Sequence, residues 1–280
     1  MFLHNKIIII FITFLSIIIP NESIANSFSK ENNKRIISLS SLGADIVSKL
    51  DNNSLVGIPG STLLKKENEF SEKVIVSEGR MPPSLEKIIK LKPNLVIGSA
   101  GFHDNILDKL NELNIETFKT NTKSINQLEI LIADLANYLD KDPSKLKESI
   151  KSCYLNKPKS KGTAVILANT KPLLSPNSNS WAGKLLDRFN FDNISKNLES
   201  KTEFKGYVNL SPEIILKAKP SKIIVITFPG MNQNVLLSNP VLKEVISSYD
   251  TELITFNYYG LINPGSLKTI NNACEKLSNI

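Results

Sequence analysis

The chain alternates two kinds of apolar pattern after residue 26. Short, nearly continuous apolar runs are typical of buried strands, and apolar residues that recur every three or four positions are typical of amphipathic helices. Their alternation predicts an α/β fold with mostly parallel strands. We expect strands at 35–39, 55–58, 74–76, 95–98, 116–118, 163–167, 223–227 and 252–256, and helices at 44–50, 84–91, 104–113, 181–189, 212–218, 241–248 and 264–277.

One stretch of sequence occurs twice. Residues 84–97 align with residues 211–224 at a constant offset of 127 positions, and the first strands of the two halves lie 128 positions apart. Each copy places a glutamate, Glu86 or Glu213, in the first turn of a helix, where the helix dipole favours an anion, and ends that helix at Lys-Pro. A shared offset for strand and helix predicts two similar lobes.

The region between the two halves is predicted to connect them. Residues 124–153 carry a single apolar stripe with helical spacing, which breaks or kinks at residues 140–143. We therefore expect an N-terminal lobe at 26–123, a connecting helix at 124–156 and a C-terminal lobe at 157–280. Two lobes joined by a long helical connection predict a ligand cleft between them.

The first 25 residues form a separate segment. Lys6 precedes a 13-residue run (7–19) that is almost wholly apolar, Pro20 follows it, and Ser23 and Ala25 offer small residues for cleavage. The run is shorter than the ~20 residues of a membrane-spanning helix, and no cysteine follows it to carry a lipid anchor. The pattern predicts a signal peptide, cleaved near Ala25, and export to the periplasm; an uncleaved membrane anchor is the alternative.

Charge and cysteine content limit the classes of function. The 34 Lys and Arg residues outnumber the 27 Asp and Glu residues, which gives a net charge of +7, but the lysines are scattered and no arginine-rich or aromatic-interleaved patch is present. We expect no nucleic-acid partner for an exported protein of this kind. Cys153 and Cys274 would enter an oxidising compartment, where they form one disulfide or remain two buried thiols. The sequence leaves both alternatives open.

The loops that follow the predicted strands carry the candidate binding residues, because ligands of α/β sheets bind beyond the carboxyl ends of the strands. Aromatic residues make up only 7% of the chain, yet many fall in these loops, which indicates an aromatic-walled site for a bulky ligand rather than a sugar-sized pocket. The alternative for each aromatic is packing of its loop onto the lobe. The candidates, with two serines that follow the first strand, are Ser40, Ser41, Phe102, Trp181, Tyr207, Phe228, Tyr258 and Tyr259.

Arg80 is the most informative single candidate. Lysine supplies 31 of the 34 basic residues, yet an arginine stands in this Gly- and Pro-bounded loop at a strand end. Its planar guanidinium can bind a carboxylate or the oxygens of a chelate in bidentate fashion, which lysine cannot do. The alternative is an ordinary surface charge, which we assign to Arg188.

Together these features resemble the periplasmic binding proteins of ABC importers for iron–siderophore complexes and cobalamin. The resemblance covers nearly all of residues 34–277, and the paired glutamate phrases are its most specific part. It is carried by residues 35–41, 80–86 and 92–96 and by the repeated phrase from Glu213 to Pro220.

Within that family, the spacing of Arg80 and Glu86, the loop 99–102 and the Tyr-Tyr-Gly loop 258–260 are similar to the hydroxamate-siderophore branch. The resemblance implies an exported, monomeric binding protein with no cofactor or metal ligands of its own. It would capture an iron(III)–siderophore complex and deliver it to an ABC permease dimer in the inner membrane. Glu86 and Glu213 would then dock onto arginines of the permease.

Other functions remain as alternatives. Cobalamin binders of the family tend to have an aromatic residue where Arg80 stands, whereas Tyr207 would suit either ligand. Haem would need Tyr207, Tyr258 or His103 as an axial ligand. An exported hydrolase is a distant alternative, because no Gly-x-Ser-x-Gly elbow accompanies His103. A site for bare Zn or Mn needs several histidines and carboxylates, and His103 is the only histidine left after processing.

Overall fold

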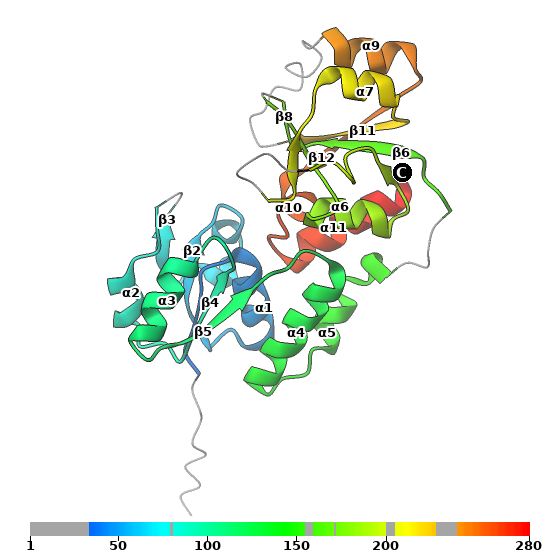
Figure 1. The fold of residues 1–280 in the computed structure, drawn as a ribbon. Coiled ribbons are helices and arrows are strands. Elements are labelled where there is room, and N and C mark those ends of the chain that lie inside the picture. Colours follow the sequence, from blue (N-terminus) through cyan, green and yellow to red (C-terminus); the bar gives the residue numbers. More distant parts are fainter. Residues whose placement is uncertain (1–33, 79–80, 155–158, 171, 200–204, 228–239) are drawn as a thin grey trace, which may run out of the picture. The chain divides into compact units, whose positions relative to one another are not determined.

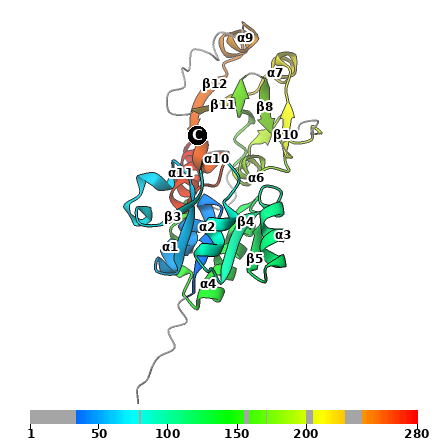
Figure 2. The ribbon, with the colours of Figure 1, turned by 90° about the vertical axis from the view of Figure 1, so that its left-hand side faces the viewer.

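The computed structural model describes residues 34–78, 81–154, 159–170, 172–199, 205–227 and 240–280. Lys34–Ile280 form one compact unit. Two parallel sheets in this unit each carry helices on both faces (Figures 1 and 2). Within these described residues, no helix is long and apolar enough to cross a membrane.

The N-terminal lobe is built on a five-stranded parallel sheet in the order β3-β2-β1-β4-β5. Its elements are β1 (Ile36–Ser38), α1 (Ser41–Asp51), β2 (Leu55–Gly60), η1 (Leu64–Lys66), η2 (Asn68–Phe70), β3 (Val74–Glu78), α2 (Leu85–Lys90), β4 (Leu95–Ser99), α3 (Asp104–Glu112) and β5 (Glu116–Thr120). Side chains alternate between the faces of a strand. Ile36 therefore joins one apolar cluster with α1, and Ile37 joins another with α2 and α3.

The C-terminal lobe combines a four-stranded parallel sheet, β12-β11-β6-β9, with a small antiparallel sheet, β10-β8-β7. Its elements are β6 (Thr163–Leu167), β7 (Asn169–Thr170), β8 (Leu173–Pro176), α6 (Trp181–Arg188), β9 (Asp192–Asn193), β10 (Tyr207–Asn209), α7 (Pro212–Ala218), β11 (Lys222–Thr227), α9 (Pro240–Ser248), β12 (Glu252–Asn257), α10 (Tyr258–Leu261) and α11 (Leu267–Asn279). Ile224 of β11 clusters with α6 and α11, and Val225 clusters with α7 and α9. This lobe therefore has the same three layers as the first.

The pairing of the strands confirms the prediction of two similar lobes. Ile36 of β1 pairs with Leu95 of β4, and Ala164 of β6 pairs with Lys222 of β11. The equivalent residues are thus offset by the same 128 and 127 positions that the sequence repeat shows. The order β2-β1-β4-β5 in one sheet corresponds to β9-β6-β11-β12 in the other.

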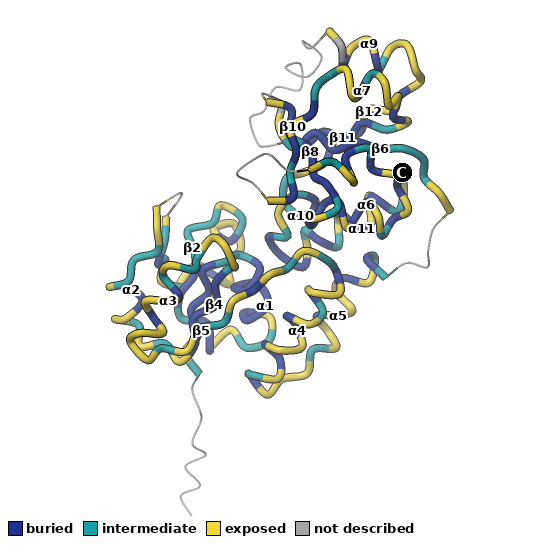
Figure 3. The backbone as a smooth tube through the Cα atoms, in the orientation of Figure 1, coloured by how far each residue is buried: buried dark blue, intermediate teal, exposed yellow. Residues whose placement is uncertain are grey.

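The described part of the connection between the sheets, up to Tyr154, consists of two helices and a short turn. Helix α4 (Ile125–Leu139) ends at Asp140, whose backbone is left-handed with φ of 54°. Helix α5 (Ser144–Glu148) and the turn η3 (Lys151–Tyr154) follow. The break predicted at residues 140–143 is therefore present. Apolar residues of α4 and α5 join those of α1, α6 and α11 in one core to which both large sheets contribute (Figure 3).

The last helix, α11, is held by residues that are distant in the sequence. Cys274 of α11 forms a disulfide with Cys153 of η3, so the first of the two alternatives for these cysteines is the one observed. At the start of α11, the N–H of Leu267 donates to the Asp45 carboxylate of α1. At its end, the ammonium of Lys161 donates to three backbone carbonyls. An anion at the first end and a cation at the second both complement the helix dipole.

Some element boundaries and one sheet differ from the prediction. Helix α1 begins earlier than expected, at Ser41, and helix α11 begins at Leu267, after the N-cap Ser266, rather than at Pro264. The antiparallel sheet β10-β8-β7 was not predicted. Its strands are short and lie among turn-forming residues, so the apolar pattern that indicates a strand is weak there.

Candidate functional site

Ser40 and Ser41 lie where the first strand of the N-terminal lobe ends, and both are half-buried. We expected these two serines in the loop that follows the first strand. In the structure Ser40 is the N-cap of α1, and its hydroxyl accepts the N–H of Gly43 at 3.2 Å. The Ser38 hydroxyl donates to the Ser40 carbonyl at 2.8 Å. The Ser40 hydroxyl oxygen is therefore engaged in helix capping.

Phe102 projects from a tight turn at the end of β4, and its side chain is 84% exposed. The turn is well held. The N–H of Ala100 donates to the Thr120 carbonyl at 2.9 Å, and the N–H of Gly101 donates to the Asp104 carboxylate at 3.0 Å. Because the backbone of this turn is already fixed, a ligand that covers Phe102 restricts its side chain but has little backbone to order.

His103 follows in the same turn and was a candidate axial ligand for haem. Its Nδ1 accepts the backbone N–H of Ser99 at 2.9 Å. Burial lowers the pKa of His103, although Asp104 opposes this effect. A neutral imidazole whose Nδ1 is an acceptor carries its proton on Nε2. Nε2 is therefore a hydrogen-bond donor in this geometry, which argues against coordination of iron by His103.

Three tyrosines lie together in the C-terminal lobe. Tyr258 and Tyr259 follow β12, and their rings meet edge to face with centroids 5.4 Å apart. Burial raises the pKa of Tyr207 at the start of β10, and the neighbouring Tyr258 adds to this effect. Burial also raises the pKa of Tyr258. The Tyr207 and Tyr258 phenols are therefore neutral at physiological pH.

Residues 258–265, which we call the tyrosine loop, contact the N-terminal lobe. The hydroxyls of Thr62 and Tyr259 are 3.4 Å apart. A Cβ placed on Gly265 would lie 2.7 Å from both the Leu63 side chain and the Tyr259 ring, so these residues are closely packed. The sequence does not predict these contacts, because the Asn-Pro-Gly run that contains Gly265 indicates a turn and carries no information on its distant neighbours.

The position of Trp181 corrects one prediction. We expected this residue to line the binding surface, but its side chain is only 4% exposed and lies in the core. Its indole N–H donates to the carbonyl of Gly260 in the tyrosine loop at 2.8 Å. Trp181 therefore supports that loop from behind. The error arose because an aromatic residue at a helix start fits either role, and the sequence does not show which side of the helix faces the core.

Two predicted ligand-binding residues, Arg80 and Phe228, lie outside the described residues. The structure therefore brings together Tyr207, Tyr258 and Tyr259 among the candidates. It places Ser40, Ser41 and Phe102 on the N-terminal lobe, at the carboxyl ends of β1 and β4. Within the described part of the chain, no three His, Cys, Asp or Glu side chains gather as a metal site would require.

Glu86 and Glu213 occupy equivalent positions and both are exposed. Each lies in the first turn of its helix, α2 or α7. The Ser211 hydroxyl and then the backbone N–H of Glu213 lower the pKa of the Glu213 carboxyl, which is therefore ionised at neutral pH. The predicted placement of one carboxylate on each repeated helix agrees with these positions, and their docking role stays a prediction.

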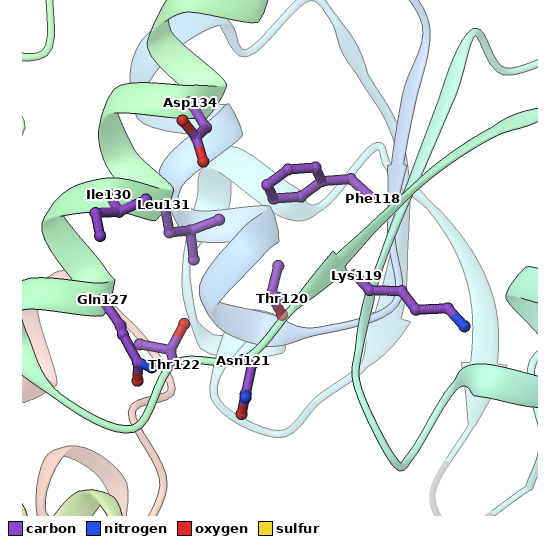
Figure 4. A pocket seen from close by; sticks show the side chains of 9 residues that line it. All are labelled: Phe118, Lys119, Thr120, Asn121, Thr122, Gln127, Ile130, Leu131 and Asp134. Carbon is purple, nitrogen blue, oxygen red and sulfur yellow. The ribbon is translucent and has the colours of Figure 1, made fainter.

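A cavity of about 140 Å³ lies between the end of β5 and α4 (Figure 4). The predicted ligand-binding residues that the structure describes do not line it. The described walls come from Phe118 and Thr120 on one side and from Gln127, Ile130 and Asp134 on the other. The ligand cleft expected between the lobes is a different place and stays a prediction.

The sequence matches the periplasmic binding protein family over residues 36–246. No curated protein sequence matches the chain. Three solved structures have the same fold and each aligns with 88% of this chain. An ABC transporter substrate-binding protein from Listeria monocytogenes is 21% identical over 97% of its own length, with a TM-score of 0.68.

The other two structures come from Vibrio cholerae. A periplasmic vitamin B12 binding protein is 18% identical over 95% of its length, with a TM-score of 0.66. A periplasmic haem-binding protein is also 18% identical, over 99% of its length, with a TM-score of 0.66. At these identities the structural similarity establishes the two-lobed fold. The family match covers most of the chain, which therefore belongs to the periplasmic binding protein family, a family of solute-binding proteins that work with ABC permeases and are not enzymes.

Proposed function

We propose that this protein is the binding component of an ABC importer that captures an iron(III)–siderophore complex in the periplasm and delivers it to an inner-membrane permease. Family membership supports a solute-binding role and a periplasmic location. In the proposal the segment 1–25 directs export and is cleaved near Ala25. The mature protein acts as a monomer and holds its ligand between the lobes.

The observation that carries the proposal is the tyrosine loop where it meets the N-terminal lobe. Tyr258 and Tyr259 are half-buried phenols that follow β12, the edge strand of the parallel sheet in one lobe, and the hydroxyl of Thr62 in the other lobe lies 3.4 Å from the Tyr259 hydroxyl. Phenol side chains supply both apolar ring surface and hydroxyl donors. A metal chelate has an apolar exterior around oxygen ligands, so this combination fits its surface, and the exposed Phe102 offers a further ring.

Arg80 has a defined part in the proposal. Its guanidinium would bind the oxygen shell of the chelate with two parallel hydrogen bonds. Arg80→Lys keeps the charge but removes the bidentate guanidinium, so we expect the binding free energy to weaken by ~1.5–3 kcal/mol. Lys65→Ala, which removes an exposed lysine of the same lobe, is the control and should leave affinity unchanged. An Arg80→Ala protein that binds every ligand as tightly as the wild type would remove Arg80 from the site.

Haem and cobalamin are the alternative ligands. Related structures are described as binding vitamin B12 and haem, and Tyr207 and Tyr258 are oxygen donors of the kind that haem iron accepts. The Nδ1 hydrogen bond of His103 leaves the tyrosines as the candidate axial ligands. A Soret band on addition of haemin, lost in Tyr258→Phe, would favour haem over the siderophore.

A fluorescence titration tests the proposal. Trp181 is the single tryptophan of the chain, and its indole N–H is bonded to the tyrosine loop. Mature protein is titrated with a ferric trihydroxamate, a ferric tricatecholate, cobalamin and haemin. We expect saturable quenching by the ferric trihydroxamate at the lowest concentration. Tight binding of cobalamin or haemin alone would overturn the siderophore assignment and leave the family assignment intact.

A further inference from the structure

Asp45 is a buried acidic residue that is not among the candidates above. It lies on α1 of the N-terminal lobe, and its side chain is only 5% exposed. Its Oδ2 accepts the backbone N–H of Leu267 at 2.8 Å, and its Oδ1 pairs with the ammonium of Lys49 on the same helix. A buried carboxylate is costly unless it is paired and hydrogen-bonded. These two contacts therefore determine where the Asp45 side chain lies.

The Leu267 amide is one of the groups that a helix leaves without an internal partner at its start. Ser266 and Thr269 form a capping box, in which the Ser266 hydroxyl accepts the Thr269 N–H and the Thr269 hydroxyl accepts the Ser266 N–H. The Leu267 N–H needs a different acceptor. Asp45 supplies it from 222 positions earlier in the chain, and its negative charge also complements the dipole of α11.

The first turns of α11 are packed directly on the tyrosine loop. A Cβ placed on Gly260 would lie 2.0 Å from the carbonyl oxygen of Thr269, so the two backbones touch there. Within the loop, the N–H of Gly260 donates to the Asn263 carbonyl at 2.8 Å. The loop and the start of α11 therefore form one stiff unit, and whatever holds Leu267 also holds this unit.

We infer that Asp45 is a positioning residue for the ligand site. By holding the start of α11 from the N-terminal lobe, it sets where Tyr258 and Tyr259 stand relative to the residues that the N-terminal lobe contributes. The inference rests on the proposed function for the identity of the site, but the positioning is a property of the protein without ligand. The Thr62–Tyr259 contact joins the same regions, but it is longer and Thr62 is exposed, so the buried Asp45 bond is the stronger of the two.

Trp181 reports on this positioning because its indole N–H donates to the Gly260 carbonyl. The experiment compares wild-type protein with Asp45→Ala and Asp45→Asn. Ser124→Ala is the matched control, since it removes an N-cap hydrogen bond to Gln127 on a different helix, α4. For each folded protein, emission and acrylamide quenching of Trp181 are measured without ligand, followed by a titration with the ferric trihydroxamate.

We expect Asp45→Ala to shift Trp181 emission to longer wavelength and to increase its quenching, whereas Ser124→Ala leaves both unchanged. Asp45→Asn should restore the wild-type spectra, because its amide oxygen can still accept the Leu267 N–H. Affinity for the ferric trihydroxamate should fall about tenfold in Asp45→Ala, since a buried hydrogen bond to a charged group is lost. The control should bind like the wild type.

Unchanged emission and quenching in folded Asp45→Ala would overturn the inference, whatever the wild type binds. Failure of the wild type to bind any probe would instead overturn the proposed ligand, and the ligand-free spectra would still decide the role of Asp45. If Asp45→Ala does not fold, hydrogen exchange of the wild-type protein tests the same bond. Fast exchange at the Leu267 amide, which donates to Asp45, would overturn the inference.

Discussion

The two lobes have equivalent parallel sheets and differ in the elements added at the edges of those sheets. In both, a repeated helix leads into an inner strand, and the order β2-β1-β4-β5 is matched by β9-β6-β11-β12. Beyond this shared part, the N-terminal sheet continues with the parallel strand β3. The C-terminal lobe instead adds the antiparallel sheet β10-β8-β7 and the short helix α10. The repeat therefore supplies the scaffold, and the parts outside it supply the differences between the lobes.

The paired glutamates and the clustered tyrosines follow the same division. Glu86 and Glu213 lie on the repeated helices and occupy matching places. Tyr207 lies on β10 and Tyr258 on α10, which are outside the repeat. A pair of like charges at equivalent places suits a partner that is itself two-fold symmetric, whereas an asymmetric ligand needs different residues from each lobe. Under the proposed function, this comparison predicts that the repeated helices dock onto the permease and that the tyrosines outside the repeat recognise the ligand.

Reversing the charge of both repeated glutamates is the strongest test of this predicted division of roles. In Glu86→Lys with Glu213→Lys, we expect ligand uptake by cells to collapse while ligand affinity in solution stays unchanged, because two attractive contacts become repulsive. Each single reversal should give an intermediate loss that is larger at low salt. Glu112→Lys with Glu244→Lys is the control, since it places the same charge change on exposed residues of α3 and α9. Normal uptake by the double reversal would leave these glutamates as helix-end charges only.

Removing the disulfide tests a link that belongs to neither sheet. Cys153 and Cys274 are separated by 121 positions. A disulfide that closes a loop of this size lowers the conformational entropy of the unfolded chain and stabilises the folded protein by about 4–5 kcal/mol. We expect the double variant Cys153→Ser, Cys274→Ser to have a free energy of unfolding that is lower than that of the wild type by up to this amount, as measured by urea titration. Reductant should destabilise the wild type similarly and leave the double variant unaffected. A wild type that is insensitive to reductant under unfolding conditions would contradict this role.

The sequence was sufficient to predict the repeated strands and helices. It was insufficient to predict the contacts between residues that are distant in the chain. The offset between Glu86 and Glu213 predicted equivalent strands correctly, because local apolar pattern and turn residues determine each strand and helix. The bond from Asp45 to Leu267 spans 222 positions, and no local pattern encodes such a pairing. One signal was present: Asp45 is a lone acidic residue within the apolar stretch 42–48, which indicates a specific partner but does not name it.

We expect the stability of the protein to fall at alkaline pH because of a tyrosine that lies outside the repeat. Burial raises the pKa of Tyr207, whereas an unfolded tyrosine has a pKa of about 10. Above that pH the unfolded chain releases a proton that the folded protein retains, so stability is full below about pH 10 and falls as the pH rises further. Tyr207→Phe should reduce this fall. Tyr249→Phe, which changes an exposed tyrosine of the same lobe, is the control and should leave the fall in stability unchanged. Urea titrations of both variants from pH 9 to pH 11, about one unit either side of the unfolded pKa, would measure the two effects.

The smallest expected effect concerns the residue that ends each repeated helix. Lys92 and Lys219 precede the two prolines of the repeat, and both have a left-handed backbone, with φ of 47° and 45°. A side chain costs about 1–2 kcal/mol in this conformation, and glycine removes most of that cost. The repeat alone therefore predicts that Lys92→Gly and Lys219→Gly stabilise the protein equally, by about 0.5–1 kcal/mol once the greater freedom of glycine in the unfolded chain is included.

The structure predicts instead that the two lobes respond differently. The ammonium of Lys219 lies 4.6 Å from the ring centroid of Tyr249, and an exposed contact of this kind is worth about 0.5–1 kcal/mol. Lys219→Gly loses the contact while it relieves the backbone, so we expect almost no net change, whereas Lys92→Gly retains its full gain. The matched alanine variants keep the Cβ and isolate the backbone effect, and thermal unfolding of all four proteins gives the comparison. Equal stabilisation by the two glycine substitutions would show that the backbone repeat alone governs these positions and that the Tyr249 contact contributes nothing.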